Sequence, residues 1–128
     1  MSENDMVDRK VLVLSGTALD WAVASAQGSN PINFQQFFVT LMPVVVLADW
    51  DDATEYAPSS DWSQGGPILA DNRISVEFAE DEEAEGWVAY IDSEGELFHG
   101  GTALEAAMRC FVASKFGSSM NIPSLLAA

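Results

Sequence analysis

Residues 56–69 constrain the fold more than any other stretch of the sequence. They contain two prolines and two adjacent glycines, together with a tyrosine, a tryptophan and one carboxylate. Proline and glycine disfavour the interior of a helix or strand, whereas the aromatic side chains favour burial. The stretch therefore predicts an ordered, packed loop that delivers the chain from one half of the fold to the other.

Two segments have the hydrophobic periodicity of α-helices, residues 17–26 and residues 102–116. Thr17 is the expected N-cap of the first, with Asp20 placed three residues later, where a carboxylate accepts from free N–H groups. Thr102 begins the second helix with the spacing of a capping box. These are the two main helices that the sequence predicts.

The remaining elements are short. Residues 33–38 are expected to form a short helix, and Pro67 is expected to begin another one that ends near residue 72. Alternating or continuous apolar residues predict strands, with an acidic hairpin turn before the third of them. The predicted strands cover residues 44–47, 74–78, 87–91 and 97–98.

The chain has 128 residues, which is the size of one domain. The elements indicate an α+β fold, a single domain in which the two main helices pack on a small antiparallel sheet. We expect this domain to span residues 11–117, preceded by a flexible N-terminus at 1–10 and followed by a tail at 118–128.

Several chemistries are disfavoured by the residues that the chain contains. One cysteine, Cys110, and one histidine, His99, exclude an internal disulfide and a Cys/His zinc site. Cys110 has apolar helical neighbours and is expected to be a packed, inert thiol. Pro67 follows the glycine pair and lacks the N–H that a phosphate loop would use. We therefore expect no catalytic residues, no metal, no cofactor and no conventional enzyme activity.

No membrane association is expected either. The longest apolar run, residues 37–48, contains Thr40 and Pro43 and is too short to span a bilayer. The acidic N-terminal residues do not have the pattern of a signal peptide. A cytoplasmic location is the expectation that fits these features.

Three motifs connect the sequence to a known family. They lie at residues 17–24, at residues 56–69 and at residues 102–117, and the predicted strands at 74–78 and 87–91 fall between the last two. With these motifs the chain resembles the NinX-like family of small phage and prophage proteins. The resemblance implies a phage accessory role and an α-β-α sandwich-like arrangement. It supplies no catalytic residues.

Charge gives the strongest functional signal. The formal net charge is −15, and residues 49–96 hold fifteen acids and one base, Arg73. Such a charge repels nucleic acid and anionic membranes, and it suits either a protein partner with a basic surface or simply a highly soluble surface. Acids at alternate positions of an extended strand would stand about 6.6 Å apart, and such a ribbon can imitate a nucleic-acid backbone. The candidate acidic face consists of Glu77, Glu80, Asp81, Glu82, Glu83, Glu85, Asp92, Glu94 and Glu96.

The leading hypothesis is a non-catalytic phage protein that binds and modulates or inhibits a host protein through this face, such as a CRISPR-type defence factor or a nucleic-acid-handling factor. One alternative is a small-ligand site on the central loop, formed by Tyr56, Asp61, Trp62 and Gln64. In the competing structural interpretation, Asp61 caps the following turn while Tyr56 and Trp62 fill the core. Another alternative is a homo-oligomer that associates through residues 34–38.

Overall fold

The structure of the protein is a computed structural model that describes residues 6–27, 33–36, 43–46, 56–80, 85–92 and 95–126. Their elements follow in the order β1 (Met6–Lys10), η1 (Val11–Val13), α1 (Gly16–Ala26), β2 (Asn33–Gln36), β3 (Pro43–Val46), α2 (Trp62–Asp71), β4 (Ser75–Glu80), β5 (Glu85–Tyr90), β6 (Phe98–Gly100), α3 (Ala103–Phe116), β7 (Ser119–Pro123) and η2 (Ser124–Leu126). The strands form antiparallel sheets, β1-β7, β2-β3 and β4-β5-β6. The predicted α+β class is confirmed, with a third α-helix beside the two expected ones.

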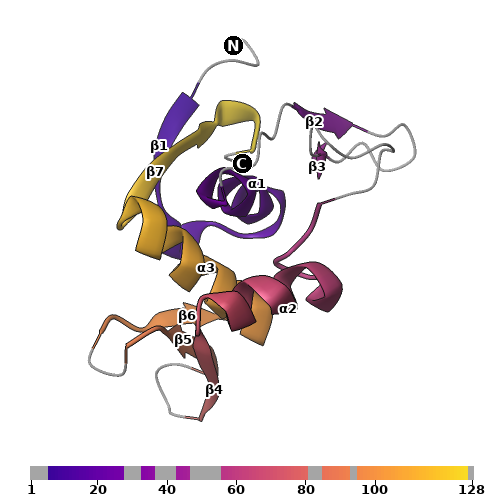
Figure 1. The fold of residues 1–128 in the computed structure, drawn as a ribbon. Coiled ribbons are helices and arrows are strands. Elements are labelled where there is room, and N and C mark those ends of the chain that lie inside the picture. The colour runs from indigo at the N-terminus through magenta and orange to yellow at the C-terminus, as the bar shows by residue number, and fades with distance from the viewer. Residues whose placement is uncertain are drawn as a thin grey trace.

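Helix α3 lies at the centre of the fold, between α1 and the β4-β5-β6 sheet, with α2 alongside it (Figure 1). It begins where the capping box predicts. Thr102 Oγ1 accepts a hydrogen bond from the Glu105 N–H at 3.0 Å, and Glu105 Oε1 accepts one from the Gly101 N–H at 3.0 Å. These bonds satisfy donors that have no partner within the helix. Met108 and Val112 are fully buried, so α3 contributes much of the core.

Helix α1 begins earlier than the sequence predicts. Its N-cap residue is Ser15, whose side chain makes no capping hydrogen bond within the described residues, and Thr17 lies inside the first turn. Leu19 and Val23 are fully buried and belong to the same core cluster as α3. The helix is thus held by the packing of its apolar face, which does not depend on a side-chain cap.

The β4-β5-β6 sheet has one covered face and one open face. Ala89 and Phe98 are buried on the face toward α3, whereas Glu77 and His99 are exposed on the other face. The register is continuous from Ser75↔Tyr90 to Glu80↔Glu85, and successive side chains alternate between the faces. Figure 1 shows the helices on one side of this sheet. The described residues therefore differ from the α-β-α sandwich that the family resemblance implies.

The two ends of the described chain pair with each other, in contrast to the expected flexible N-terminus and tail. β1 and β7 are antiparallel, with Val7 opposite Ile122, and Ile122 is 1% exposed. The residues of β1 are mostly polar, so their sequence gives no periodic signal for a strand. The strand forms because β7 supplies backbone partners and packs against α1 and α3.

Two further predictions about local structure are wrong. Residues 33–36 form β2, which pairs with β3 at Phe34↔Val45, in place of the expected short helix. The predicted strand at residues 44–47 is confirmed as β3. Residues 62–71 form α2, although their glycines and proline predict a loop followed by a helix from Pro67. An Asp61 cap accounts for the early start of α2, because its Oδ1 accepts from the Ser63 N–H at 2.9 Å.

Gly65 explains why α2 contains residues that weaken a helix. A Cβ atom at this position would lie 2.3 Å from the carbonyl oxygen of Pro58 and 2.8 Å from Cδ2 of Leu104. Only glycine allows α2 to approach both the preceding turn and α3 so closely. The low helix propensity of glycine is therefore offset by the packing that it permits.

Candidate functional site

The predicted acidic face maps to the β4-β5-β6 sheet and its connections. The structure describes the side chains of Glu77, Asp92 and Glu96, and all three are exposed. Glu80 and Glu85 are described by their backbones alone, which pair with each other at the end of the β4–β5 hairpin. The remaining predicted acids lie outside the described residues: Asp81, Glu82, Glu83 and Glu94.

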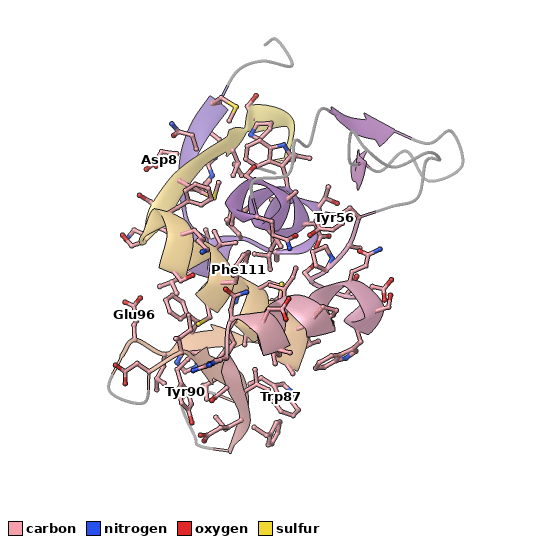
Figure 2. The ribbon with its side chains drawn as sticks, viewed as in Figure 1. Asp8, Tyr56, Trp87, Tyr90, Glu96 and Phe111 are labelled. Carbon is pink, nitrogen blue, oxygen red and sulfur yellow. The ribbon has the colours of Figure 1, made fainter. Side chains whose placement is uncertain are left out.

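The described acids are not arranged as the predicted ribbon. Glu77 projects from the outer face of β4, but Asp92 and Glu96 lie in the connection between β5 and β6. This connection contains a turn in which the Gly95 N–H donates to the Asp92 carbonyl oxygen at 2.7 Å. Asp92 and Glu96 therefore do not have the regular spacing of an extended strand. Glu96 nevertheless lies at the same end of the molecule as Tyr90 (Figure 2).

Basic residues are scarce around this end. Residues 74–100 contain nine acids and no lysine or arginine. The nearby Arg109 is used internally: its Nε donates to the Leu14 carbonyl oxygen at 2.8 Å and its Nη1 to the His99 carbonyl oxygen at 2.7 Å. Its Nη2 lies 3.4 Å from Glu105 Oε1. Arg109 thus joins α3 to β6 and to the segment before α1, and its donors are directed at groups other than the exposed acids.

On the outer face of the sheet, Glu77 is held by a tyrosine. The Tyr90 hydroxyl donates a hydrogen bond of 2.5 Å to Glu77 Oε1. This bond is the main cause that raises the pKa of Tyr90 above its usual value. Val88 lies opposite both Glu77 and His99 in the register and is 8% exposed. The outer face therefore presents an oriented carboxylate beside an aromatic hydroxyl.

The hairpin also exposes an apolar group that the charge pattern does not reveal. Phe78 is 53% exposed and packs edge-to-face on Trp87, with ring centroids 5.5 Å apart and an interplanar angle of 73°. The two residues are directly opposite in the β4–β5 register. An exposed aromatic next to carboxylates is typical of protein interfaces more than of a purely solvated surface. The alternation of apolar and polar residues at 74–78 predicted the strand that contains Phe78, but it gave no sign that Phe78 would be exposed.

A shallow pocket of about 230 Å³ opens beside the acidic connection. Ile91, Phe98, Cys110 and Ala113 supply most of its apolar lining, and Glu96 lies at its edge. Burial, and then the charge of Glu96, raise the pKa of the Cys110 thiol to about 11. The thiol is therefore protonated near neutral pH, which agrees with the predicted inert cysteine.

The alternative loop site is largely occupied by its own contacts. Tyr56 is buried and donates to Gln27 Oε1, while Gln64 Oε1 accepts from the Ala57 N–H at 2.5 Å. Asp61 caps α2, as the structural interpretation predicts. Trp62, expected in the core, is instead 56% exposed. The structure brings these four residues together around the start of α2, and Tyr56, Asp61 and Gln64 direct polar groups at the protein itself.

Asp20 is the central polar residue of this region, and its role differs from the predicted one. It is 4% exposed, and its Oδ1 accepts from the Ser59 N–H at 2.8 Å. Burial of Tyr56 and then the charge of Asp20 raise the pKa of Tyr56 to about 12. The carboxylate thus joins α1 to the 56–61 turn. The sequence signal for its burial was its position in the helix. Asp20 stands three and four residues before Val23 and Ala24, so it lies on the same helix face as these apolar residues.

The described residues include no cluster of three or more His, Cys, Asp or Glu side chains suited to a metal ion. Within the same ranges, no helix combines the length and apolar character needed to cross a membrane.

Comparison with known proteins identifies a family for the chain. The family model described as Bacteriophage P22, NinX matches residues 10–115, which is most of the sequence. This match includes all three motifs on which the sequence resemblance was based, except for the last residues of the third. Among curated proteins, none matches the chain.

Proposed function

The chain belongs to the bacteriophage P22 NinX family, and from this premise we propose that it is a non-catalytic phage accessory protein that binds and modulates another protein. The binding surface is the acidic end of the molecule, formed by the β4-β5-β6 sheet and its connections. The partner is a host protein with a basic surface, such as a CRISPR-type defence factor or a nucleic-acid-handling factor. The interaction takes place in the cytosol of the bacterial host.

One observation carries this proposal, namely the separation of charge along the fold. Residues 74–100 have nine acids and no lysine or arginine, and they fold as a single sheet with its connections. Of the exposed bases, Arg9 and Lys10 lie on β1, and Lys115 lies in the last turn of α3 with its Nζ 5.8 Å from the Phe111 ring centroid. Arg73, also exposed, lies in the turn just before β4. Glu77 and Glu96, whose side chains are exposed, therefore lie in a segment that supplies no lysine or arginine to pair with them.

The physical consequence is competition with nucleic acid. A basic groove attracts the phosphate backbone mainly by charge, and a protein surface with a similar density of carboxylates is attracted by the same groove. Association by such contacts is fast at low salt and weakens as ionic strength rises. The protein itself is repelled by nucleic acid, so it acts on the nucleic-acid-binding protein and not on its ligand.

The test uses bacterial proteins bound to DNA-cellulose at low salt. The purified chain is added, and displaced proteins are identified at two salt concentrations. We expect the chain to displace a small set of proteins at about 50 mM salt and to lose most of this effect at about 200 mM, because screening shortens the range of charge interactions.

A matched pair of double variants locates the surface. Glu77→Gln with Glu96→Gln removes two charges from the acidic end, and Asp8→Asn with Asp71→Asn removes two exposed charges elsewhere. We expect the first pair to weaken displacement about tenfold and the second pair to have little effect. Equal effects of the two pairs, or displacement that is insensitive to salt, would contradict the proposal.

The alternative functions stay predictions. A small-ligand site at the Tyr56 loop predicts ligand-dependent thermal stabilisation. Association through residues 34–38 predicts an oligomer in sedimentation experiments, and only the backbone of residues 34–36 in that segment is described.

A further inference from the structure

Strand β4 forms an outer edge of its sheet. The strand order is β4-β5-β6, so β4 pairs with β5 on one side, and no strand within the described ranges pairs with it on the other side. In an antiparallel pair, alternate residues of an edge strand direct their N–H and C=O groups away from the neighbouring strand. The outer side of β4 therefore presents a row of backbone donors and acceptors.

This edge is unusually regular. The register with β5 runs through six consecutive pairs, from Ser75↔Tyr90 to Glu80↔Glu85, without the extra residue of a bulge. Residues 75–80 contain no proline and no lysine. Edge strands commonly avoid unwanted pairing by means of prolines, bulges, short length or lysines. In β4, the feature that can oppose unwanted pairing is the negative charge of Glu77 and Glu80.

The other exposed strands differ from β4. β6 has three residues and packs closely on α3, since a Cβ atom on Gly100 would lie 2.5 Å from the Ala106 nitrogen. β1 is five residues long, but it carries Asp8 beside two basic residues, Arg9 and Lys10. The edge of β4 is thus longer and of a single charge sign.

Side chains on both faces of β4 indicate the chemistry of a strand that would pair with it. On the outer face, Glu77 is oriented by Tyr90. On the opposite face, Phe78 is 53% exposed and packs on Trp87. An added strand places alternate side chains beside these two residues, so it fits best with a basic residue beside Glu77 and an apolar residue beside Phe78.

Charge also selects between the candidate occupants. A second copy of this chain would bring another β4 with Glu77 and Glu80 to the edge, and each copy has a net charge of −15. Like charges at close range oppose this pairing, whereas a basic segment is attracted to the same edge. The acids therefore disfavour self-association and favour a basic partner.

We propose that the open edge of β4 accepts an extended, basic segment of a partner protein as a fourth strand, with lysine or arginine on the Glu77 face and apolar residues on the Phe78 face. This inference rests on the proposed function, because it specifies how the acidic end engages its partner. Backbone hydrogen bonds supply affinity in this mode of recognition, and the alternating side chains supply specificity.

The test compares two synthetic eight-residue peptides with the same charge. One alternates lysine and valine, and the other alternates lysine and proline, which removes half of the backbone N–H groups and disfavours a strand. Binding to the full chain is measured by fluorescence anisotropy at low salt. We expect the lysine–valine peptide to bind at least about tenfold more tightly, since a few backbone hydrogen bonds together contribute a factor of this size.

Hydrogen exchange on the unmodified chain shows where the peptide binds. We expect the lysine–valine peptide to slow exchange of amides in residues 75–80 by about tenfold or more, with little change in residues 6–10 of β1. As a second check, Glu77→Lys should reduce binding strongly, while Asp8→Lys on β1 should not. Hydrogen exchange requires no variant, so a folding defect in Glu77→Lys does not affect it.

Equal affinity of the two peptides, with unchanged exchange in β4, would overturn strand addition. Displacement of proteins from DNA-cellulose could still succeed in that case, and the acidic surface would remain the proposed binding site. Conversely, strand addition with no displacement would support the β4 edge and count against competition with nucleic acid. The two experiments therefore separate failure of this inference from failure of the proposed function.

Discussion

The turn before α2 and the β4–β5 hairpin use their polar residues in opposite ways. In the turn, the buried Asp20 carboxylate and the Gln64 side chain accept hydrogen bonds from backbone N–H groups at Ser59 and Ala57. In the hairpin, Glu77 is exposed, and its carboxylate accepts a hydrogen bond from the Tyr90 hydroxyl at the protein surface. A polar residue with internal partners stabilises the fold, whereas an exposed and oriented one can meet a partner. The comparison shows why the aromatic loop, despite its composition, is the weaker site candidate.

The largest expected effect comes from filling the closest contact of the turn. Gly65→Ala places a methyl group 2.3 Å from the Pro58 carbonyl oxygen. We expect it to lower the free energy of unfolding by about 3 kcal/mol, as overpacking of a rigid contact does. Urea unfolding measures this change.

Gly66→Ala is the matched control for this prediction. The nearest atom to its new Cβ would be Trp62 Cε3 at 3.7 Å, an ordinary contact. We expect this variant to be neutral or more stable by about 0.5–1 kcal/mol, because alanine favours a helix. Similar losses of stability in both variants would show that the approach of α2 to Pro58 is not the reason for glycine at position 65.

A somewhat smaller loss is expected at the buried carboxylate. Asp20→Ala leaves the buried Ser59 N–H without the acceptor that it has at 2.8 Å. The expected loss of unfolding free energy is about 2 kcal/mol, the cost of a buried donor without a partner. Asp20→Asn keeps an oxygen acceptor and should lose less, and Asp71→Ala, at an exposed position, should change stability by less than about 0.5 kcal/mol. Equal melting temperatures for Asp20→Ala and Asp71→Ala would contradict a stabilising role for Asp20.

The smallest expected effect is a loss of stability at high pH, which should depend on Tyr56 more than on Tyr90. The pKa of Tyr56 is raised from 10.0 to about 12, so between these values the unfolded chain loses its proton while the folded chain keeps it. Stability is therefore unaffected by this group below pH 10 and falls as pH rises from 10 to 12, by about 1.4 kcal/mol at pH 11.

Tyr56→Phe should remove that part of the alkaline loss, as measured by urea unfolding at pH 9, 10 and 11. Tyr90→Phe is the control, because its hydroxyl is on the surface and bonded to Glu77. We expect its alkaline profile to follow that of the natural chain more closely. A Tyr56→Phe profile that cannot be distinguished from the natural one would contradict the assignment of the buried hydroxyl. Cys110, whose pKa is raised to about 11, contributes to the loss that remains in both variants.

Local patterns predicted some elements well and failed at others for identifiable reasons. The α3 cap at Thr102, the strand at β3 and the β4–β5 hairpin follow from signals within a few residues. β1 was missed because its pairing partner, β7, is more than one hundred residues away in the chain. The first half of α2 was missed because the glycines argue against a helix before Pro67, and the close contact that requires Gly65 exists only after folding.

The candidate site divides in the same way. The excess of acids in residues 74–100 is a property of the sequence, and so is the alternation that makes β4 a strand. The exposure of Phe78 and the hydrogen bond from Tyr90 to Glu77 could not be inferred, since each depends on which face of the sheet α3 covers. The turn that contains Asp92 and Glu96, by contrast, is indicated by the sequence itself, because Gly95 and the polar residues around it are typical of turns.

Composition and short-range periodicity determined that this protein is a highly acidic α+β chain with a strong central helix and a charged hairpin, because these features depend on residues close together in sequence. The tertiary structure decided that residues 62–71 form α2 with Trp62 exposed, that the two ends of the described chain pair, and that one edge of the hairpin is open. These outcomes depend on contacts between distant segments, and the free energy of such contacts can override local preference.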